Sequence, residues 1–130
     1  MSLVVDASVV TSALVADGPD GEWAISLLTA YPLVAPQLLP VEVANALRRA
    51  AARGAVSQDV ASLAHADLMR LRVRLFSYAP LAERIWGLRG NLTAYDAWYV
   101  ALAEALGAPL ATLDRRLSKA KGPSCAFLLP

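Results

Sequence analysis

The sequence predicts an α/β fold with a central, mainly parallel sheet of four to five strands. Short apolar runs rich in β-branched residues alternate with longer segments of helical periodicity, and the connections between them are mostly short. Hydrophobic residues make up 57% of the 130 residues and charged residues 18%, which indicates a compact globule with a proper core. No repeat, low-complexity tract or linker divides the chain, so we expect one domain over residues 1–130.

The first half of the chain is expected to hold two strands and four helical segments. In chain order these are a strand over 3–5, a weak helix over 9–16, a turn over 18–21, a helix over 22–30, a strand over 33–35, a helix over 38–53 and a helix opened by Ser57. The run Leu3-Val4-Val5 is typical of a buried central strand. Pro40 is tolerated because it falls in the first turn of its helix, and Gly54 ends that helix.

The second half is expected to add three strands and three helices. These are a strand over 73–76, a helix over 80–88, a helix over 93–106, a strand over 110–113, a basic helix over 114–121 and a strand over 126–129. Arginines in the strand at 73–76 indicate an edge position. Ile85 and Trp86 are expected to point inward. The helix at 93–106 is apolar nearly all round and is therefore expected to be packed on several sides, with Thr93 as its N-cap.

Charge is distributed unevenly along the chain, although the formal net charge is only +1. Residues 1–47 hold five acids and no Lys or Arg, whereas residues 48–130 hold all twelve basic residues and six acids. This pattern indicates an anionic partner over part of the surface, and ordinary solvated helix faces are the alternative. The basic candidates that follow acidic turns are Arg48, Arg49, Arg53, Arg115 and Arg116.

Targeting and redox signals point to the cytoplasm. The apolar stretch over 3–16 contains Asp6 and three hydroxyl residues, and no Lys or Arg precedes it, so neither a signal peptide nor a membrane span is expected. The single cysteine, Cys125, cannot form an internal disulfide and fits a reducing compartment.

Four acids far apart in the sequence are expected to meet at one edge of the sheet. Asp6 leaves the first strand, Asp114 leaves the fourth, and Glu42 and Asp96 lie in the opening turns of their helices. In a parallel α/β sheet the carboxyl ends of strands and the amino ends of the following helices share the edge where ligands bind. Each acid alone is also explained as a helix cap or a partner of the helix dipole.

Together, however, the four carboxylates would repel one another. Two carboxylates about 4 Å apart repel by roughly 4 kcal/mol at an effective dielectric constant near 20. Such a cluster must take up protons or bind a cation, and its oxygen ligands favour Mg²⁺ or Mn²⁺ over zinc. A carboxylate-held Mg²⁺ at a sheet edge usually serves phosphate chemistry.

The four acids lie in four characteristic segments: VVDAS, which holds Asp6; LLPVEVANAL, which holds Glu42 and Asn45; LTAYDAWYVALAE, which holds Asp96; and LATLDRRL, which holds Thr112 and Asp114. In these segments the sequence resembles the PIN-domain ribonucleases, and in size and motif order the VapC toxins of bacterial toxin–antitoxin pairs. The resemblance covers essentially the whole chain. Any one of these motifs is weak, but four of them in this order are fairly specific.

The resemblance implies a three-layer α/β/α fold and Mg²⁺- or Mn²⁺-dependent endonucleolytic cleavage of single-stranded RNA. It implies Asp6 and Asp96 as principal metal ligands, Glu42 as a direct or water-mediated ligand, and Asp114 as the group that completes the site. Ser8, Asn45 and Thr112 would be polar groups that support these ligands. It further implies a homodimer and inhibition by a VapB-type antitoxin, whose C-terminal segment covers the acidic site in a hetero-oligomer.

The expected reaction is in-line attack of a metal-activated water on a phosphodiester, which leaves a 5′-phosphate and a 3′-hydroxyl. The main alternative is a PIN-like module that binds RNA or a partner protein without turnover, and the presence of all four acids argues against it. Receiver-type phosphoacceptors and haloacid-dehalogenase-type phosphatases also place acids at this edge. Both are disfavoured, because the first strand is followed by neither paired acids nor Asp-x-Asp: Ser8 stands at the second position after Asp6.

Overall fold

The computed structural model describes residues 1–130 and is organised around a five-stranded sheet in which every pairing is parallel. Its strands are β1 (Leu3–Val5), β2 (Leu33–Pro36), β3 (Val73–Phe76), β4 (Leu110–Ala111) and β5 (Phe127–Leu128). They lie in the order β3-β2-β1-β4-β5. The central position of β1 and the edge position of β3 confirm the prediction from their composition.

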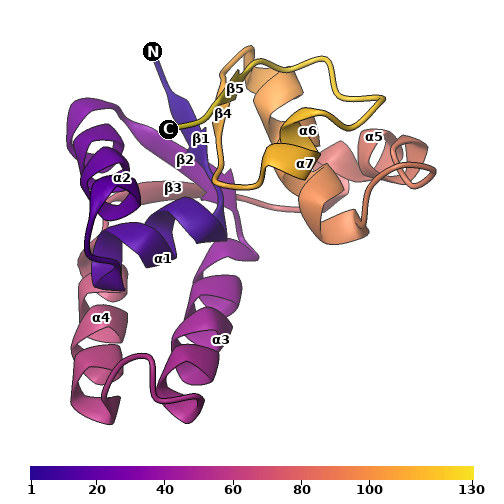
Figure 1. Ribbon diagram of the computed structural model, residues 1–130. Helices are drawn as coiled ribbons and strands as arrows, with labels where there is room; N and C mark the ends of the chain where they lie inside the picture. Colours follow the sequence, from indigo (N-terminus) through magenta and orange to yellow (C-terminus); the bar gives the residue numbers. More distant parts are fainter.

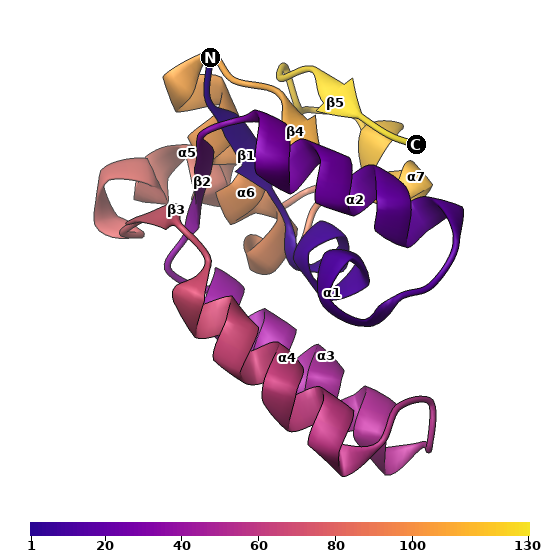
Figure 2. The ribbon, with the colours of Figure 1, turned by 90° about the vertical axis from the view of Figure 1, so that its left-hand side faces the viewer.

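Helices cover both faces of the sheet, which confirms the predicted three-layer α/β/α architecture (Figure 1). They are α1 (Ala7–Val15), α2 (Pro19–Ala30), α3 (Leu39–Ala52), α4 (Gln58–Arg70), the 3₁₀ helix η1 (Ala79–Leu81), α5 (Ala82–Gly87), α6 (Ala94–Leu106) and α7 (Arg115–Ser118). In Figure 1, α1 and α2 lie to one side of the sheet and α5 and α6 to the other. Figure 2 shows α3 and α4 projecting from the rest of the molecule as a helical hairpin. None of these helices has the length and apolar character needed to cross a membrane.

The topology creates one preferred place for a ligand. Strand β1 pairs with β2 on one side and with β4 on the other. The chain therefore continues from β1 to its neighbour β2 on one side, and from β4 to β5 on the other side of the sheet. Ligands of open α/β sheets bind at such switch points, beyond the carboxyl ends of the strands. Asp6 directly follows β1, and Thr112 directly follows β4. The site therefore lies at this edge because of strand order alone.

Helix α6 is the most deeply packed helix and also opens onto this edge. Its residues 99–103 are all buried, and Gly107 ends it in the left-handed conformation with φ of +61°. Thr93 caps its first turn by accepting a hydrogen bond from the backbone N–H of Asp96 at 3.2 Å. Capping thus uses the backbone of Asp96 and leaves its carboxylate free for another role.

The predicted turn over residues 18–21 is wrong in its last three residues, because α2 already begins at Pro19. Gly18 turns the chain with a φ of +91°, and a proline is favourable in the first turn that follows. Gly21 packs against the end of α1, where an added Cβ would lie 2.3 Å from the carbonyl oxygen of Ala16. Only a glycine permits this close helix contact, and a tertiary contact of this kind has no local sequence signal.

The expected inward position of Trp86 is also wrong, since this side chain is 65% exposed while Ile85 is buried. Helix α5 has only six residues and packs on α6 with one side, so consecutive residues cannot both face the core. Arg89 covers part of the exposed ring, with its guanidinium carbon 4.5 Å from the ring centroid. Val60 and Leu63 are exposed for a similar reason, because α4 belongs to the projecting hairpin.

Candidate active site

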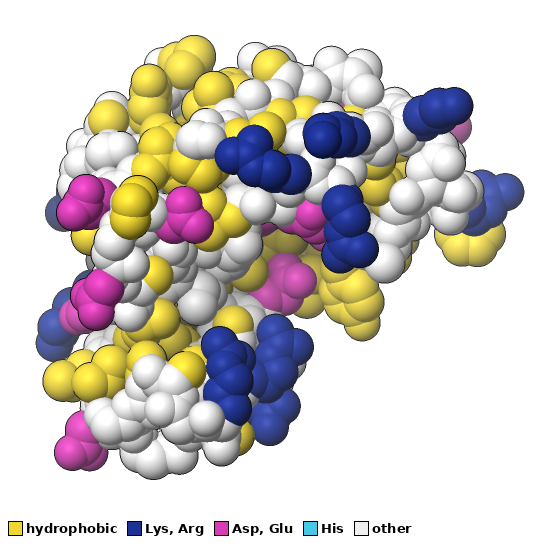
Figure 3. All heavy atoms as spheres, viewed as in Figure 1, with side chains coloured by type: hydrophobic (Ala, Val, Ile, Leu, Met, Phe, Trp, Pro, Cys, Tyr) yellow, Lys and Arg dark blue, Asp and Glu magenta, His cyan; other side chains and the backbone are white.

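The structure brings the four predicted acids to the carboxyl edge of the sheet. Asp6 is the N-cap of α1, Glu42 and Asp96 lie in the first turns of α3 and α6, and Asp114 is the N-cap of α7. The charges of Asp6 and Asp96 raise the pKa of Glu42, the charge of Asp96 raises the pKa of Asp6, and the charge of Asp114 raises the pKa of Asp96. Figure 3 shows acidic side chains in the hollow between the α3 side and the α6–α7 side of the molecule.

Burial raises the pKa of three of these carboxyl groups above the ordinary range. Burial is the largest cause for Asp6, Glu42 and Asp96 alike. The neighbouring carboxylates raise these pKa values further, while hydrogen bonds from Ser8 and Thr112 counteract the effect at Asp6. None of the four acids forms an ion pair with Lys or Arg. The negative charge is therefore left for a cation or a proton to balance.

The carboxylates form a row rather than a ring around one point. No three of them lie close enough together to hold a single ion by direct contact. Mg²⁺ is commonly bound by one or two carboxylates and keeps several waters, so an oxygen-only row of this kind still fits it chemically. The assignment of individual metal ligands stays a prediction.

Asp6 and Asp114 both use Oδ1 to cap a helix. Asp6 Oδ1 accepts hydrogen bonds from the hydroxyl of Ser8 and from the backbone N–H of Val9, and the side chain of Thr112 also stabilises this carboxylate. Asp114 Oδ1 accepts two backbone N–H groups of the first turn of α7, at 2.9 and 3.2 Å, whereas its Oδ2 accepts no hydrogen bond. At Asp114 capping and ligand binding are therefore compatible, because they use different oxygens.

Glu42 is held in the same way, by Tyr99, which was not among the predicted site residues. Tyr99 is 2% exposed, and its hydroxyl donates a hydrogen bond of 2.7 Å to Glu42 Oε1. Burial and the adjacent carboxylate raise the pKa of Tyr99, so its hydroxyl remains a donor. Tyr99 lies three residues after Asp96, on the same face of α6, and this spacing is the signal that identifies it. Asp96 is held less tightly, since the side chain of Thr93 is the one group whose hydrogen bond lowers the pKa of its carboxyl group.

Two of the three predicted supporting residues, Ser8 and Thr112, contact the acids, and the third, Asn45, does not. The hydroxyl of Ser8 bridges the site, since it donates to Asp6 and accepts the backbone N–H of Leu113 at 3.1 Å. Thr112 is fully buried, and its Oγ1 accepts the backbone N–H of Asp114 at 3.0 Å. The prediction for Asn45 is wrong: Asn45 is exposed, and its Oδ1 accepts a hydrogen bond from Arg48 one turn along α3.

The five predicted RNA-binding arginines divide into two groups. Arg49 and Arg53 line a groove of about 460 Å³ together with Glu42, and Arg116 shares a hollow of about 240 Å³ with Asp96 and Asp114. These three guanidinium groups form no ion pair and donate no hydrogen bond within the chain. Arg49 therefore pairs neither with Glu42 nor with Asn45, although all three lie on α3.

Arg48 and Arg115 are turned away from the acids. Arg48 lines a separate groove between α3 and α4 with His65, which is exposed. Arg115 donates a hydrogen bond of 3.1 Å to the carbonyl oxygen of Pro130. Position on the helix thus separates Arg48 from Arg49, although the two are neighbours in the sequence.

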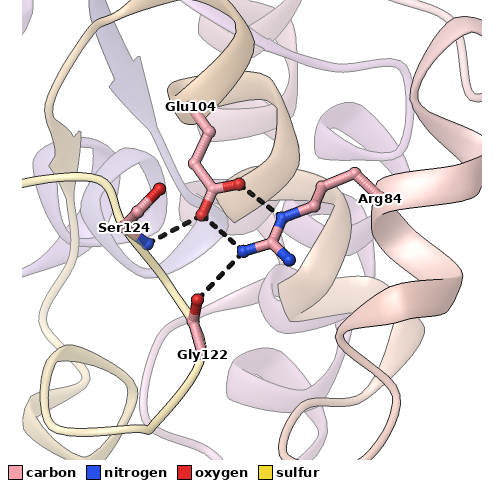
Figure 4. Close-up of polar contacts among 4 residues, drawn as sticks. All are labelled: Arg84, Glu104, Gly122 and Ser124. Carbon is pink, nitrogen blue, oxygen red and sulfur yellow. Dashed lines mark hydrogen bonds and ion pairs between the residues drawn. The ribbon is translucent and has the colours of Figure 1, made fainter.

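Glu104, unlike the four acids of the candidate site, is a structural acid that pairs with an arginine. Arg84 Nε and Nη2 donate to its two carboxylate oxygens at 2.6 and 3.1 Å, and the backbone N–H of Ser124 donates at 2.7 Å (Figure 4). Arg84 also donates to the carbonyl oxygen of Gly122, so that α5, α6 and the segment before β5 are joined. The hydrogen bonds from Arg84 lower the pKa of Glu104, which is the opposite of the shift at Asp6, Glu42 and Asp96.

Comparison with known proteins points to one family. A family model described as "PIN domain" matches residues 3–123. The VapC ribonuclease Mb0985 of Mycobacterium bovis is 43% identical over 123 residues, which cover 95% of this chain and 94% of that protein. The fold is similar to that of the Mycobacterium tuberculosis toxin VapC20, described as cleaving the sarcin–ricin loop, with a TM-score of 0.73 and 19% identity over 98% of this chain and 99% of that one. It is also similar to a chain of the VapBC2 complex of Rickettsia felis, bound to a DNA fragment from its promoter, with a TM-score of 0.70 and 12% identity over 99% and 98% of the two chains.

Proposed function

Since this chain belongs to the PIN-domain family, we propose that it is a VapC-type endoribonuclease, the toxin of a toxin–antitoxin pair, and that it depends on Mg²⁺ or Mn²⁺. Its substrate would be a single-stranded region of RNA. The observation that carries the proposal is the row of four acids at the switch point of the sheet, without a basic partner. Glu104 shows that this chain neutralises a structural acid with arginine, so the unneutralised row indicates a functional demand for a cation.

In the proposed mechanism the protein positions the reacting groups and supplies the negative charge that would hold a divalent ion. A divalent ion held by Asp6 and Asp96, with Glu42 and Asp114 in support, would polarise the phosphoryl group and lower the pKa of a water. Asp6 and Asp114 present fixed oxygens because the helix starts hold them. The phosphodiester is hydrolysed in line to a 5′-phosphate and a 3′-hydroxyl. His65 lies exposed on α4, in the groove with Arg48 rather than with the acids, so it does not serve as a general base here.

The direct test is cleavage of a single-stranded RNA by the purified chain with Mg²⁺ or with EDTA. We expect cleavage only with the divalent ion, and products that carry 5′-phosphate ends. Products with 2′,3′-cyclic phosphate ends, or equal cleavage in EDTA, would contradict the mechanism. No cleavage under either condition would favour a module that only binds.

A VapB-type antitoxin is the proposed protein partner, and the support for it is the VapBC complex among the structural neighbours. The groove between α1 and α3 leads to Glu42 and is lined by Ser8, Thr11 and Arg49, so a segment lying in it would reach the acids. We propose that the C-terminal segment of the antitoxin covers the acidic row and thereby blocks access of RNA. We propose that the protein acts in the cytoplasm, where both an RNA substrate and this partner would be present.

We further propose a homodimer formed through an apolar patch beside the active site. Leu38, Tyr78, Tyr95 and Trp98 line a hollow of about 240 Å³, and Val41, one turn after Leu38 on α3, is 66% exposed. Tyr78 and Tyr95 are 41% and 60% exposed, which is unusual for so many large apolar groups in one place. The patch adjoins both Glu42 and Asp96 in the sequence, so a second copy bound there would lie next to the acids.

The dimer proposal predicts that Val41→Asp converts the protein to a monomer. A charge buried in an apolar interface costs several kcal/mol, and each 1.4 kcal/mol weakens association about tenfold. Light scattering after size-exclusion chromatography measures the mass directly. Leu63→Asp is the matched control, because Leu63 is 68% exposed on α4 and lies outside the patch. A monomeric wild type, or a dimer that survives Val41→Asp, would refute the proposed interface.

The arginine positions predict a path for the RNA strand on both sides of the acids. Replacing Arg49 and Arg116 by Ala is expected to weaken binding of a single-stranded RNA and to lower the slope of log K against log salt by about 0.7 per arginine. Binding is measured in the Asp96→Asn background so that the RNA stays uncut. The double variant Arg48→Ala with Arg115→Ala removes the same charge away from the acids and serves as the control. Equal slopes in the two double variants would mean that the arginines act only through net charge.

A further inference from the structure

The hydrogen bond between Tyr99 and Glu42 joins two helices across the candidate site. Tyr99 lies on α6 and Glu42 on α3, and the hydroxyl of Tyr99 is 2.7 Å from Glu42 Oε1. Tyr99 is buried in a stretch of α6 whose other members, residues 100–103, are all apolar and buried. Asp96 lies one turn earlier on the same helix, so α6 supplies one carboxylate of the row and also the group that holds another.

A buried tyrosine hydroxyl needs a hydrogen-bond partner for its own sake, and this need alone would explain a contact with any acceptor. The fact that Glu42 is the acceptor indicates that Tyr99 has a role beyond satisfying its own hydroxyl. Glu42 is only partly buried, and it lines the open groove with Arg49 and Arg53. A glutamate there has three flexible torsions and an open groove to turn into. Glu42 nevertheless pairs with neither arginine and is held by Tyr99 on the side of Asp6 and Asp96.

We propose that Tyr99 is a positioning residue, which holds the Glu42 carboxylate through Oε1 and leaves Oε2 as the oxygen that faces a divalent ion or its bound water. This inference rests on the proposed metal-dependent function. Residues that orient metal ligands contribute substantially to metal affinity, and their loss typically lowers it 10- to 100-fold. Tyr99 would act through Glu42 and would not touch the ion or the RNA.

The test is a double-mutant cycle on the full chain with Mn²⁺ alone as the probe. The affinity for Mn²⁺ is measured by isothermal titration calorimetry for the wild type, Tyr99→Phe, Glu42→Gln and the variant with both changes. Tyr99→Phe keeps the buried ring and is expected to lower the affinity about tenfold. In the Glu42→Gln background the same change is expected to have no further effect, because the carboxylate that Tyr99 positions is already gone.

Tyr31→Phe is the matched control, because the hydroxyl of Tyr31 forms no hydrogen bond within the chain, and it is expected to bind Mn²⁺ like the wild type. Equal losses of affinity from Tyr99→Phe in both backgrounds would show a general structural effect and overturn the positioning role. Wild-type affinity in Tyr99→Phe would overturn it as well, while leaving the metal site standing. A wild type that binds no Mn²⁺ would instead overturn the proposed function itself.

Discussion

Replacing Asp96 by Asn is expected to lower the rate of RNA cleavage by about a hundred- to thousandfold while raising the melting temperature of the metal-free protein. The Asp96 carboxylate forms no ion pair, and Asn keeps an oxygen for the side chain of Thr93, so the change removes the charge of a ligand with little loss of structural contact. It also removes a half-buried charge that lies near Asp6, Glu42 and Asp114. Activity and stability should therefore change in opposite directions.

The same substitution is expected to alter the pH dependence of stability. Burial, followed by the charge of Asp114, raises the pKa of Asp96 above its ordinary value of 3.8. At pH values between 3.8, the ordinary pKa, and the raised pKa of the folded state, the folded protein binds more protons than the unfolded chain. The free energy of unfolding therefore decreases as the pH rises through this window. Thermal melts in EDTA at a series of pH values should show a smaller decrease for Asp96→Asn than for the wild type.

Asp59→Asn is the control for this experiment, because Asp59 also lies in the first turn of a helix but is exposed on α4. It is expected to leave cleavage unchanged and to cost at most a few tenths of a kcal/mol through the helix dipole. Unchanged cleavage in Asp96→Asn would remove this residue from the metal site. A lower melting temperature in the absence of metal would contradict the electrostatic account of the row.

The second large effect is expected from the metal alone. A divalent ion that binds only the folded state stabilises it by about 2.7 kcal/mol at a concentration of 100 Kd, which corresponds to a rise in melting temperature of roughly 10 °C for a chain of this size. We expect Mg²⁺ or Mn²⁺ to produce such a rise in differential scanning fluorimetry and EDTA to reverse it. The reason is that the ion relieves the repulsion among carboxylates that no Lys or Arg neutralises.

Two comparisons make this result specific. NaCl at matched ionic strength screens exposed charges and is expected to produce a much smaller rise. The double variant Asp6→Asn with Asp96→Asn is expected to melt at the same temperature with and without Mg²⁺. A rise of equal size in that variant would place the ion elsewhere on the molecule, and no rise in the wild type would count against a resident metal.

The order of the elements and the convergence of the acids were predictable because they depend on local pattern and on topology. An apolar run followed by Asp6, and capping residues before α6 and α7, are readable along the chain. The rule that parallel strands end at one edge then brings the four acids together without any knowledge of packing. Trp86 and Pro19 were misplaced, since their positions depend on how one helix meets another. Such contacts leave no periodic signal in a short segment.

The amino-acid sequence by itself determined the sheet, the family and the four acids at one edge of it, because hydrophobic periodicity and capping chemistry act over short distances along the chain. Only the tertiary structure decided which carboxylate oxygens accept hydrogen bonds, among them Glu42 Oε1, which accepts one from Tyr99. It also decided that Arg49 rather than Arg48 lines the groove that contains Glu42. The physical reason is that a hydrogen bond depends on position to within a few tenths of an ångström. Helix packing sets that position, through side chains that the sequence separates by tens of residues.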